Sequence, residues 1–239
     1  MSVDNLLVDD SCSNGSSLQQ GEQKNSSDIL FIDKPKGITS FGVIRELRKK
    51  LNIKKMGHAG TLDPLATGLL IIACGKATKR ISEFMGLPKE YVVDIEFGKT
   101  SNTYDADGSV TPHAGSHLPE FLAMPRSHFE SFLPQFIGDI LQTPPIFSAL
   151  KVKGRRAYDL ARTGQAVHLE PRKVHVSSIE ILDFSWPIVR LRIACSKGTY
   201  IRSIAHDLGQ VLGCGGYVKE LRRTKIGGYR VEDAQLLVN

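Results

Sequence analysis

Residues 57–68 form a short run rich in glycine and proline, Gly57-His58-Ala59-Gly60-Thr61-Leu62-Asp63-Pro64-Leu65-Ala66-Thr67-Gly68. Three glycines and one proline within twelve residues indicate a loop whose backbone takes conformations that other residues rarely adopt. Pro64 fixes its own φ, lacks an N–H group and biases the preceding Asp63 away from the α region. The spacing leaves two interpretations of Asp63 open: a carboxylate held for chemistry, or an Asx-type turn that caps the segment 65–72.

The composition is that of a globular protein with one large domain or two small ones. The 239 residues are 41% hydrophobic and 23% charged, which are ordinary values. The longest apolar run, 69–74, has six residues, and the N-terminus lacks a basic region followed by an apolar core. The sequence therefore predicts neither a membrane span nor a secretory signal. The four cysteines are scattered without a Cys-x-x-Cys pair, which favours reduced thiols in a cytoplasmic protein over a disulfide framework or a zinc site.

The charge of the chain is distributed unevenly. The net charge is +6, but residues 1–28 hold five acidic residues and one basic residue, so the remainder carries +10. A basic body suits a polyanion such as RNA, although it is also compatible with simple solubility. Residues 1–28 are polar without apolar periodicity and are predicted to be a disordered tail, which leaves 29–239 as the folded domain.

Apolar periodicity predicts helices and strands in irregular order. The predicted helices are 41–51 (N-capped by Thr39 or Ser40), 127–136, 155–163 (ending at Gly164) and 200–212 (ending at Gly213). The predicted strands are 29–32, 91–97, and the antiparallel pair 174–184 and 188–195 joined near Trp186-Pro187. Residues 108–119 are expected to form an exposed loop. Strands and helices mixed in this way indicate the α+β class.

The run 57–68 resembles the signature loop of the TruB family of tRNA pseudouridine synthases, in which a Gly-His-x-Gly-x-Leu-Asp-Pro run carries the catalytic aspartate. Six further segments resemble the family and keep its order across about residues 29–235. Chance matches do not keep order over so long a stretch. The segments are Asp33-Lys34-Pro35-Lys36-Gly37-Ile38-Thr39-Ser40, Lys89-Glu90-Tyr91-Val92-Val93, Asp105-Ala106-Asp107-Gly108, Pro144-Pro145-Ile146-Phe147-Ser148-Ala149-Leu150-Lys151, Cys195-Ser196-Lys197-Gly198-Thr199-Tyr200-Ile201-Arg202 and Leu221-Arg222-Arg223-Thr224.

The resemblance implies the pseudouridine synthase fold: a central mixed, mostly antiparallel sheet flanked by helices, with the active-site cleft across the sheet. It implies isomerisation of the T-loop uridine at tRNA position 55 on a flipped-out base, without a cofactor or a metal. The T-arm stem-loop of tRNA is the implied partner, and we expect a monomer. Bacterial members usually continue into a small RNA-binding PUA domain. Because the chain stops at Asn239, we expect a short form without it.

The resemblance also implies roles for individual residues. Asp63 matches the catalytic aspartate, and whether it attacks carbon or removes a ribose proton stays open. A carboxylate that remains ionised in an apolar pocket needs a cationic partner, and Arg202 matches the family's arginine that pairs with the aspartate. Tyr91 matches the tyrosine that stacks on the target uracil, and Tyr200 matches a second aromatic residue of the pocket. For each of these three partners, an ordinary surface or core role is the alternative.

Two further positions are assigned through the resemblance. Leu221 corresponds to an apolar residue that lines the uracil site, and its alternative is a plain core role. His58 corresponds to a residue that inserts into the RNA fold vacated by the flipped nucleotide. A lone histidine without a second ligand at suitable spacing is rarely a metal ligand, so no metal site is predicted.

Basic residues outside the signature loop are candidates for phosphate contacts. The stretch 45–55 carries six basic residues against Glu46, and it is either an RNA-facing ridge or a solvated helix face. Arg223 is a further candidate beside Arg222. The principal phosphate candidates are Lys34, Lys79, Arg80, Lys151, Arg155 and Arg222.

Other readings of the sequence stay open. The chain could be an RNA-binding or tRNA-folding module that needs no chemistry, or a relative of the guide-RNA-dependent enzyme that modifies ribosomal RNA. A glycoside hydrolase would need a second carboxylate opposite Asp63. Asp105 and Asp107 are the nearest candidates, but beside Gly108 they are interpreted mainly as turn formers.

Overall fold

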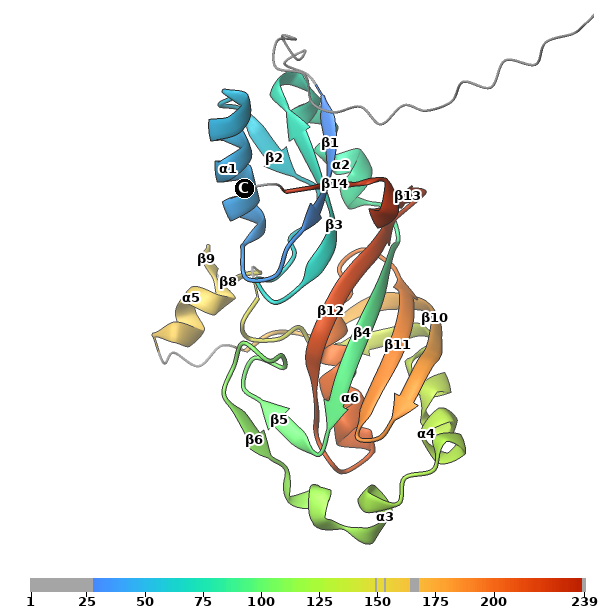
Figure 1. Ribbon diagram of the computed structural model, residues 1–239. Coiled ribbons are helices and arrows are strands. Elements are labelled where there is room, and N and C mark those ends of the chain that lie inside the picture. Colours follow the sequence, from blue (N-terminus) through green and yellow to red (C-terminus); the bar gives the residue numbers. More distant parts are fainter. Residues whose placement is uncertain (1–27, 149, 153, 164–167, 238–239) are drawn as a thin grey trace, which may run out of the picture.

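A ten-stranded mixed sheet forms the centre of the molecule in the computed structural model (Figure 1). The structure describes residues 28–148, 150–152, 154–163 and 168–237. The predictions for the tail before Asp28 and for a helix end at Gly164 lie outside these residues. The strands of the sheet are β1 (Ile29–Lys34), β2 (Met56–His58), β3 (Thr67–Cys74), β4 (Lys89–Phe97), β7 (Gly138–Gln142), β10 (Arg172–Ser185), β11 (Ile188–Cys195), β12 (Gly216–Ile226), β13 (Tyr229–Arg230) and β14 (Gln235–Leu236).

The strand order is β14-β1-β3-β12-β4-β11-β10-β7, with β2 attached to β3 and β13 to β12. The pairs β1–β14 and β3–β12 are parallel, and the other pairs of this sheet are antiparallel. The predicted mixed, mostly antiparallel sheet is therefore confirmed. Two small ribbons pair β5 (Lys99–Ser101) with β6 (Val110–Pro112) and β8 (Lys151–Val152) with β9 (Arg155–Arg156).

Six α-helices and four short 3₁₀ helices accompany the strands in the described part of the chain. The α-helices are α1 (Ser40–Leu51), α2 (Ile81–Met85), α3 (Pro119–Leu122), α4 (Arg126–Phe132), α5 (Ala157–Arg162) and α6 (Ile201–Val211). The 3₁₀ helices are η1 (Gly75–Arg80), η2 (Ala114–His117), η3 (Leu133–Phe136) and η4 (Val231–Asp233). Among the described residues, no helix combines the length and the apolar character needed to cross a bilayer.

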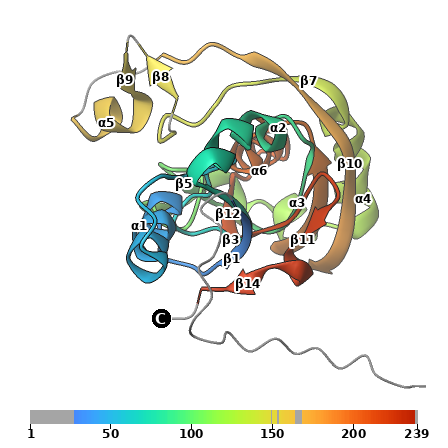
Figure 2. The same ribbon diagram turned by 90° about the horizontal axis from the view of Figure 1, so that it is seen from above.

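The helices α1 and α6 form where the apolar periodicity predicts them. The Thr39 hydroxyl accepts a hydrogen bond from the Gly42 N–H at 2.9 Å and caps α1. The apolar face of α6, including Ile204 and Leu208, is buried, and the helix packs on β12 and β4. In the two perpendicular views, the segment from β8 to α5 stands away from the sheet (Figures 1 and 2).

Three sequence predictions need correction. The helix predicted at 127–136 changes to 3₁₀ geometry at Leu133, because Pro134 has no N–H to continue the α-helical ladder. The helix predicted from Arg155 begins at Ala157, since Arg155–Arg156 pair with β8 instead. The loop expected at 108–119 contains β6 and η2.

The parallel junction between β3 and β12 joins the two halves of the sheet. Gly68 lies opposite Arg223 with φ of +100°, a left-handed conformation that favours glycine. A Cβ atom at Gly68 would overlap the Arg223 carbonyl oxygen and lie 2.8 Å from the Arg223 nitrogen. These are backbone atoms, so neither a rotamer change nor a small side-chain shift can relieve the overlap.

Gly68→Ala should therefore lower the free energy of unfolding by about 3 kcal/mol or more, because it combines backbone strain with overlap in a packed sheet. Urea denaturation of the variant and the wild type measures this. Gly228→Ala is the matched control, since no atom lies within 4 Å of the position its Cβ would take. An equal loss in both variants would remove the junction as the cause.

A cluster of hydrogen bonds around Glu96 fastens β4 to β12 and β5. The Glu96 carboxylate accepts from Lys99 Nζ at 2.6 Å and from Tyr217 Oη at 2.8 Å, and it lies 3.0 Å from Lys219 Nζ. Burial alone would raise the pKa of Glu96, but the bonds from Lys99, Tyr217 and Lys219 outweigh it and lower the pKa to about 2. The ionised carboxylate therefore stabilises the native state.

Glu96→Gln should lower the free energy of unfolding at pH 7 by about 1–2 kcal/mol, a value that allows for solvent screening by its half-exposed lysine partners. The native pKa of Glu96 lies below its ordinary value, so the stabilisation is present above about pH 4.5 and is lost as the pH falls towards 2. Urea titrations at pH 7 and pH 3 should show the difference from wild type shrinking at the lower pH. Glu180→Gln, which breaks an exposed pair with Arg192, should change stability little at either pH. A pH-independent loss in Glu96→Gln would contradict the linkage.

Candidate active site

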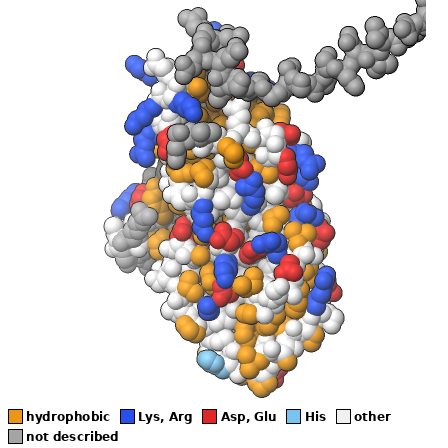
Figure 3. All heavy atoms as spheres, in the orientation of Figure 1, with side chains coloured by type: hydrophobic (Ala, Val, Ile, Leu, Met, Phe, Trp, Pro, Cys, Tyr) orange, Lys and Arg blue, Asp and Glu red, His pale blue; other side chains and the backbone are white. Residues whose placement is uncertain are grey.

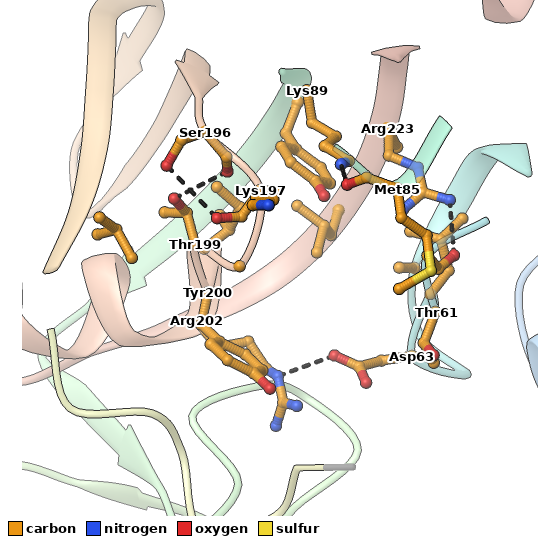
Figure 4. A pocket seen from close by; sticks show the side chains of 18 of the residues that line it. Thr61, Asp63, Met85, Lys89, Ser196, Lys197, Thr199, Tyr200, Arg202 and Arg223 are labelled. Carbon is orange, nitrogen blue, oxygen red and sulfur yellow. Dashed lines mark hydrogen bonds and ion pairs between the residues drawn. The ribbon is translucent and has the colours of Figure 1, made fainter. Parts of the chain in front are cut away.

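A cavity of about 710 Å³ is lined by part of the signature loop and by most of the residues that were assigned a role in the pocket (Figure 4). Its wall comes from the loop between β2 and β3, from α2, from the strands β4, β10 and β12, and from the start of α6 with the preceding turn. Asp63, Tyr91, Tyr200, Arg202 and Leu221 all line it. The structure thus brings together side chains that are up to 158 positions apart, since Leu221 follows Asp63 by that number.

The backbone around Asp63 is fixed on both sides. The buried Ser40 hydroxyl accepts a hydrogen bond from the Leu62 N–H at 2.8 Å and donates one to the Leu62 carbonyl oxygen at 3.0 Å. On the other side, the Pro64 carbonyl accepts from the Gly37 N–H at 2.8 Å and from Lys34 Nζ at 3.3 Å. The Asp63 carbonyl accepts from the Ala66 N–H at 3.1 Å and closes a turn. A turn does form at Asp63, but through its backbone, which leaves the carboxylate directed into the cavity.

The expected ion pair between Asp63 and Arg202 is present. Arg202 Nε lies 3.0 Å from Asp63 Oδ2, and the arginine side chain is 4% exposed (Figure 4). This Nε makes no hydrogen bond despite the short distance, so the contact is electrostatic and its N–H is not aligned with the carboxylate. The two Nη groups of Arg202 are fixed elsewhere: Nη1 donates to the Thr103 carbonyl at 2.8 Å and Nη2 to the Phe147 carbonyl at 2.9 Å.

Asp105 has a larger role than the turn former predicted from the sequence. Its Oδ1 does accept turn hydrogen bonds from the Thr103 hydroxyl at 2.6 Å and the Asp107 N–H at 3.1 Å. Its Oδ2, however, lies 3.3 Å from Arg202 Nη1, and the side chain is 5% exposed. Burial raises the pKa of Asp105. The hydrogen bond from Thr103 and the charge of Arg202 oppose this rise, while the charge of Asp63 adds to it. Arg202 therefore lies between two carboxylates, and the sequence alone does not bring Asp105 next to it.

The aromatic residues and Leu221 lie on separate elements around the cavity. Tyr91 on β4 lies opposite Arg223 on β12 in the strand register. Burial raises the pKa of the Tyr91 phenol. Leu221 is two residues before Arg223 and therefore on the same face of β12. Tyr200 precedes α6, and its backbone N–H and carbonyl both bond to the buried Gln142 side chain, at 2.8 and 3.1 Å. Gln142 is a positioning residue that the sequence analysis missed.

Two of the proposed phosphate ligands are instead internal. Lys34 is fully buried, and its Nζ donates to the carbonyls of Pro35, Ile38 and Pro64. Burial lowers the pKa of Lys34 to about 8, against the attraction of Asp63. Arg223 is 1% exposed and donates to the carbonyls of Leu69 and Gly60. Both predictions are wrong, because these cations satisfy buried backbone carbonyls and thereby hold the loop that carries Asp63.

The remaining cations divide by exposure. Lys79, Arg80 and Arg155 are exposed, while Arg222 makes a two-bond pair with Asp33 at 2.7 and 3.0 Å. Lys151 is in β8, and its side chain lies outside the described part. In Figure 3, lysine and arginine side chains gather at the upper left over α1, where the helix face of the stretch 45–55 is exposed.

Lys89 lines the cavity although the sequence analysis gave it no role. Its Nζ donates to the carbonyls of Met85 at 2.7 Å and Leu87 at 2.6 Å. Burial lowers the pKa of Lys89 to about 8, and the charges of Arg223 and Lys197 contribute, while Cys195 opposes. Lys89 is two residues before Tyr91 and therefore on the same face of the strand, and this spacing could have predicted that it lines the cavity.

His58 lies on β2 and is not among the residues that line the cavity. Burial lowers the pKa of its imidazole, as does the nearby charge of Arg223, and its buried Nδ1 makes no hydrogen bond. In the described ranges, no three His, Cys, Asp or Glu side chains are grouped so as to hold a metal ion.

Named proteins resemble this chain over most of its length. The "tRNA pseudouridine synthase B" of Phocaeicola vulgatus is 44% identical over 213 residues, covering 86% of this chain and 88% of that protein. The proteins of the same name from Opitutus terrae and Aquifex aeolicus are 45% and 48% identical. The first match covers 90% of this chain and 87% of that protein, the second 86% and 70%.

Solved structures show the same fold. The chain matches one in "Crystal Structure of a Cbf5-Nop10-Gar1 Complex" with a TM-score of 0.67 and 31% identity, covering 89% of this chain and 52% of that chain. A second match, "Structure of H/ACA RNP bound to a substrate RNA containing 2'-deoxyuridine", has a TM-score of 0.64 and 28% identity, covering 89% of this chain and 51% of that chain. This chain thus spans about half the length of those two solved chains.

Two family models match consecutive parts of the chain. The N-terminal domain of the TruB family pseudouridylate synthases matches residues 48–201, and the C-terminal domain of tRNA pseudouridylate synthase B matches residues 202–238. With the fold and the cavity agreeing with these matches, the chain belongs to the TruB family of pseudouridylate synthases.

Proposed function

We propose that this protein is a tRNA pseudouridine synthase that converts the T-loop uridine at position 55 to pseudouridine. The observation that carries the proposal is Asp63, paired with a buried arginine at 3.0 Å in a cavity with two tyrosines. The names of the relatives from Phocaeicola vulgatus and Opitutus terrae support tRNA as the substrate. We further propose that the protein acts as a monomer in the cytoplasm.

The reaction breaks the N1–C1′ glycosidic bond of uridine, turns the uracil and joins C5 to C1′. The C5 proton leaves to solvent and N1 gains a proton, so the product is an isomer of the substrate and no oxidant is needed. Asp63 supplies the carboxylate, either as a nucleophile on carbon or as a base for a ribose proton. Arg202 supplies the positive charge that faces this carboxylate, since its Nε lies 3.0 Å from Asp63 Oδ2.

The cavity suits an isolated base, not a stacked one. A uridine within the folded T-arm cannot reach Asp63 until it is extruded from its stack. We propose that Tyr91 and Leu221 hold the extruded uracil, that Tyr200 closes the adjacent wall, and that His58 fills the space left in the RNA. The uracil is thereby retained while it is free of the ribose.

The exposed cations of α1, together with Lys79 and Arg80, are proposed to contact the phosphates of the T-arm. They are exposed and lie on the same half of the molecule as β2, which bears His58. Such contacts position the RNA and make its affinity salt-dependent.

Tritium release from T-arm RNA labelled at uracil C5 tests the proposal. The wild-type protein should release tritium in a time-dependent manner, because C5 must lose its hydrogen when it bonds to C1′. An RNA with cytidine at position 55 is the negative control. Tight binding of the T-arm without release would favour the RNA-binding module, and release only from ribosomal RNA would transfer the proposal to another substrate.

A further inference from the structure

Helix α6 contacts the turn 101–108 at two points that are one helical turn apart. Arg202 Nη1 donates to the Thr103 carbonyl at 2.8 Å and lies 3.3 Å from Asp105 Oδ2. Four residues later, the His206 ring stacks on the Tyr104 ring, with centroids 3.9 Å apart and planes inclined by 7°. Residues four apart lie on one face of a helix, so both contacts come from the same side of α6. In the sequence, Tyr104 lies between Thr103 and Asp105, the two residues of the turn that Arg202 contacts.

Tyr104 has a backbone conformation that a bulky residue rarely adopts. Its φ is +63°, in the left-handed region, and such a conformation persists only where the surroundings hold it. Its N–H donates to the Ser101 carbonyl at 3.1 Å, and its carbonyl accepts from the Val218 N–H at 3.0 Å. This conformation directs the carbonyl of the preceding residue and the carboxylate of the following residue towards the same guanidinium group.

The contacts of Arg202 leave its orientation dependent on this turn. Its Nε makes no hydrogen bond and faces Asp63 through the ion pair only. Two of the groups that locate the guanidinium, the Thr103 carbonyl and the Asp105 carboxylate, belong to the turn. A shift of the turn therefore moves the cation that faces the proposed catalytic carboxylate.

We infer that the stack of Tyr104 on His206 is a positioning element for catalysis, which locks the turn 101–108 against α6 and so fixes Arg202 relative to Asp63. Neither ring is among the residues that line the cavity, so both act through Arg202 and neither contacts the substrate. The inference about turnover rests on the proposed function. The inference about the mobility of Arg202 does not, and the two are measured separately.

The first measurement follows the Arg202 Nε–H group by ¹⁵N NMR on the 239-residue chain, with the resonance assigned by its loss in Arg202→Lys. In His206→Ala, hydrogen exchange of this group should accelerate by about tenfold, because the loss of a stack frees the turn. His206→Phe keeps a ring that can stack, so it should restore slow exchange. Tyr104→Gly tolerates the positive φ but lacks the ring, so it should behave like His206→Ala.

The second measurement is tritium release with the same variants. His206→Ala and Tyr104→Gly should lose about tenfold in kcat with KM within about twofold, whereas His206→Phe should stay near the wild type. Tyr229→Ala is the matched control, because it removes ring contacts with Phe31 and Phe84, at centroid distances of 4.9 and 5.7 Å, and none of these three rings lies in the turn or lines the cavity. It should leave both the exchange of Arg202 and kcat unchanged.

Unchanged Arg202 exchange and unchanged kcat in His206→Ala and Tyr104→Gly would overturn the inference. So would faster exchange in Tyr229→Ala of the same size, since that would report general destabilisation. If the wild type releases no tritium while Arg202 exchange responds as expected, the proposed function fails and the positioning of Arg202 stands.

Discussion

Asp63→Asn should abolish tritium release, lowering turnover by about 10⁴-fold or more, while the protein still folds and binds T-arm RNA. Asparagine has nearly the shape of aspartate, but it can act neither as a nucleophile nor as a base. The backbone bonds at Leu62, Pro64 and Ala66 do not involve the carboxylate, so the loop keeps its conformation. RNA affinity is expected to change little, because phosphate contacts come from other parts of the surface.

Asp107→Asn is the matched control for this variant. Asp107 is an exposed carboxylate on the turn 101–108, and its described hydrogen bond comes from its backbone N–H to Asp105. Turnover should remain near that of the wild type. Filter binding with T-arm RNA and near-ultraviolet circular dichroism establish binding and folding for both variants. Parallel loss of binding and turnover in Asp63→Asn would count against a chemical role for Asp63.

Arg202→Met is expected to lose both activity and stability. Removing the guanidinium leaves Asp105, which is 5% exposed, without its countercharge, and it also leaves the carbonyls of Thr103 and Phe147 without a donor. Breaking a buried pair by deleting one partner costs about 3–5 kcal/mol, and we expect a loss of that size in the free energy of unfolding. Turnover should fall to background because Asp63 loses its only described ion-pair partner.

A second substitution separates the two effects. In the double variant with Asp105→Asn, the uncompensated buried charge is gone, so part of the stability should return while turnover stays at background. Arg192→Met removes an exposed arginine paired with Glu180, and it should cost less than about 1 kcal/mol. Urea denaturation measures all three proteins. Wild-type turnover in Arg202→Met would remove the ion pair from the mechanism.

The sequence pattern predicts those elements whose burial follows a simple period. Helix α6 has a continuous apolar face. In the hairpin β10–β11, apolar and polar side chains alternate along both strands, and Ser185 lies opposite Ile188 across Trp186-Pro187. The candidate site residues come from ordered motifs, and the structure brings two of them, Asp63 and Arg202, together.

The central strand β12 was missed for a physical reason. It carries charged residues along most of its length, and one of them, Arg223, is among the largest fully buried side chains. Propensity and charge both argue against a buried strand with this composition. The same reason explains the error at Lys34, since a lysine is expected at the surface unless backbone carbonyls surround its ammonium group. Only the tertiary structure supplies those carbonyls.

The position of β12 also constrains when the molecule can fold. This strand, formed by residues 216–226, fills the gap between β3 and β4, and β14 at residues 235–236 pairs with β1. During synthesis, the earlier strands emerge first and present unpaired edges until residues 216–236 have left the ribosome. The sheet is therefore completed late, through contacts of long sequence separation, which makes folding slow and exposes the nascent chain to aggregation.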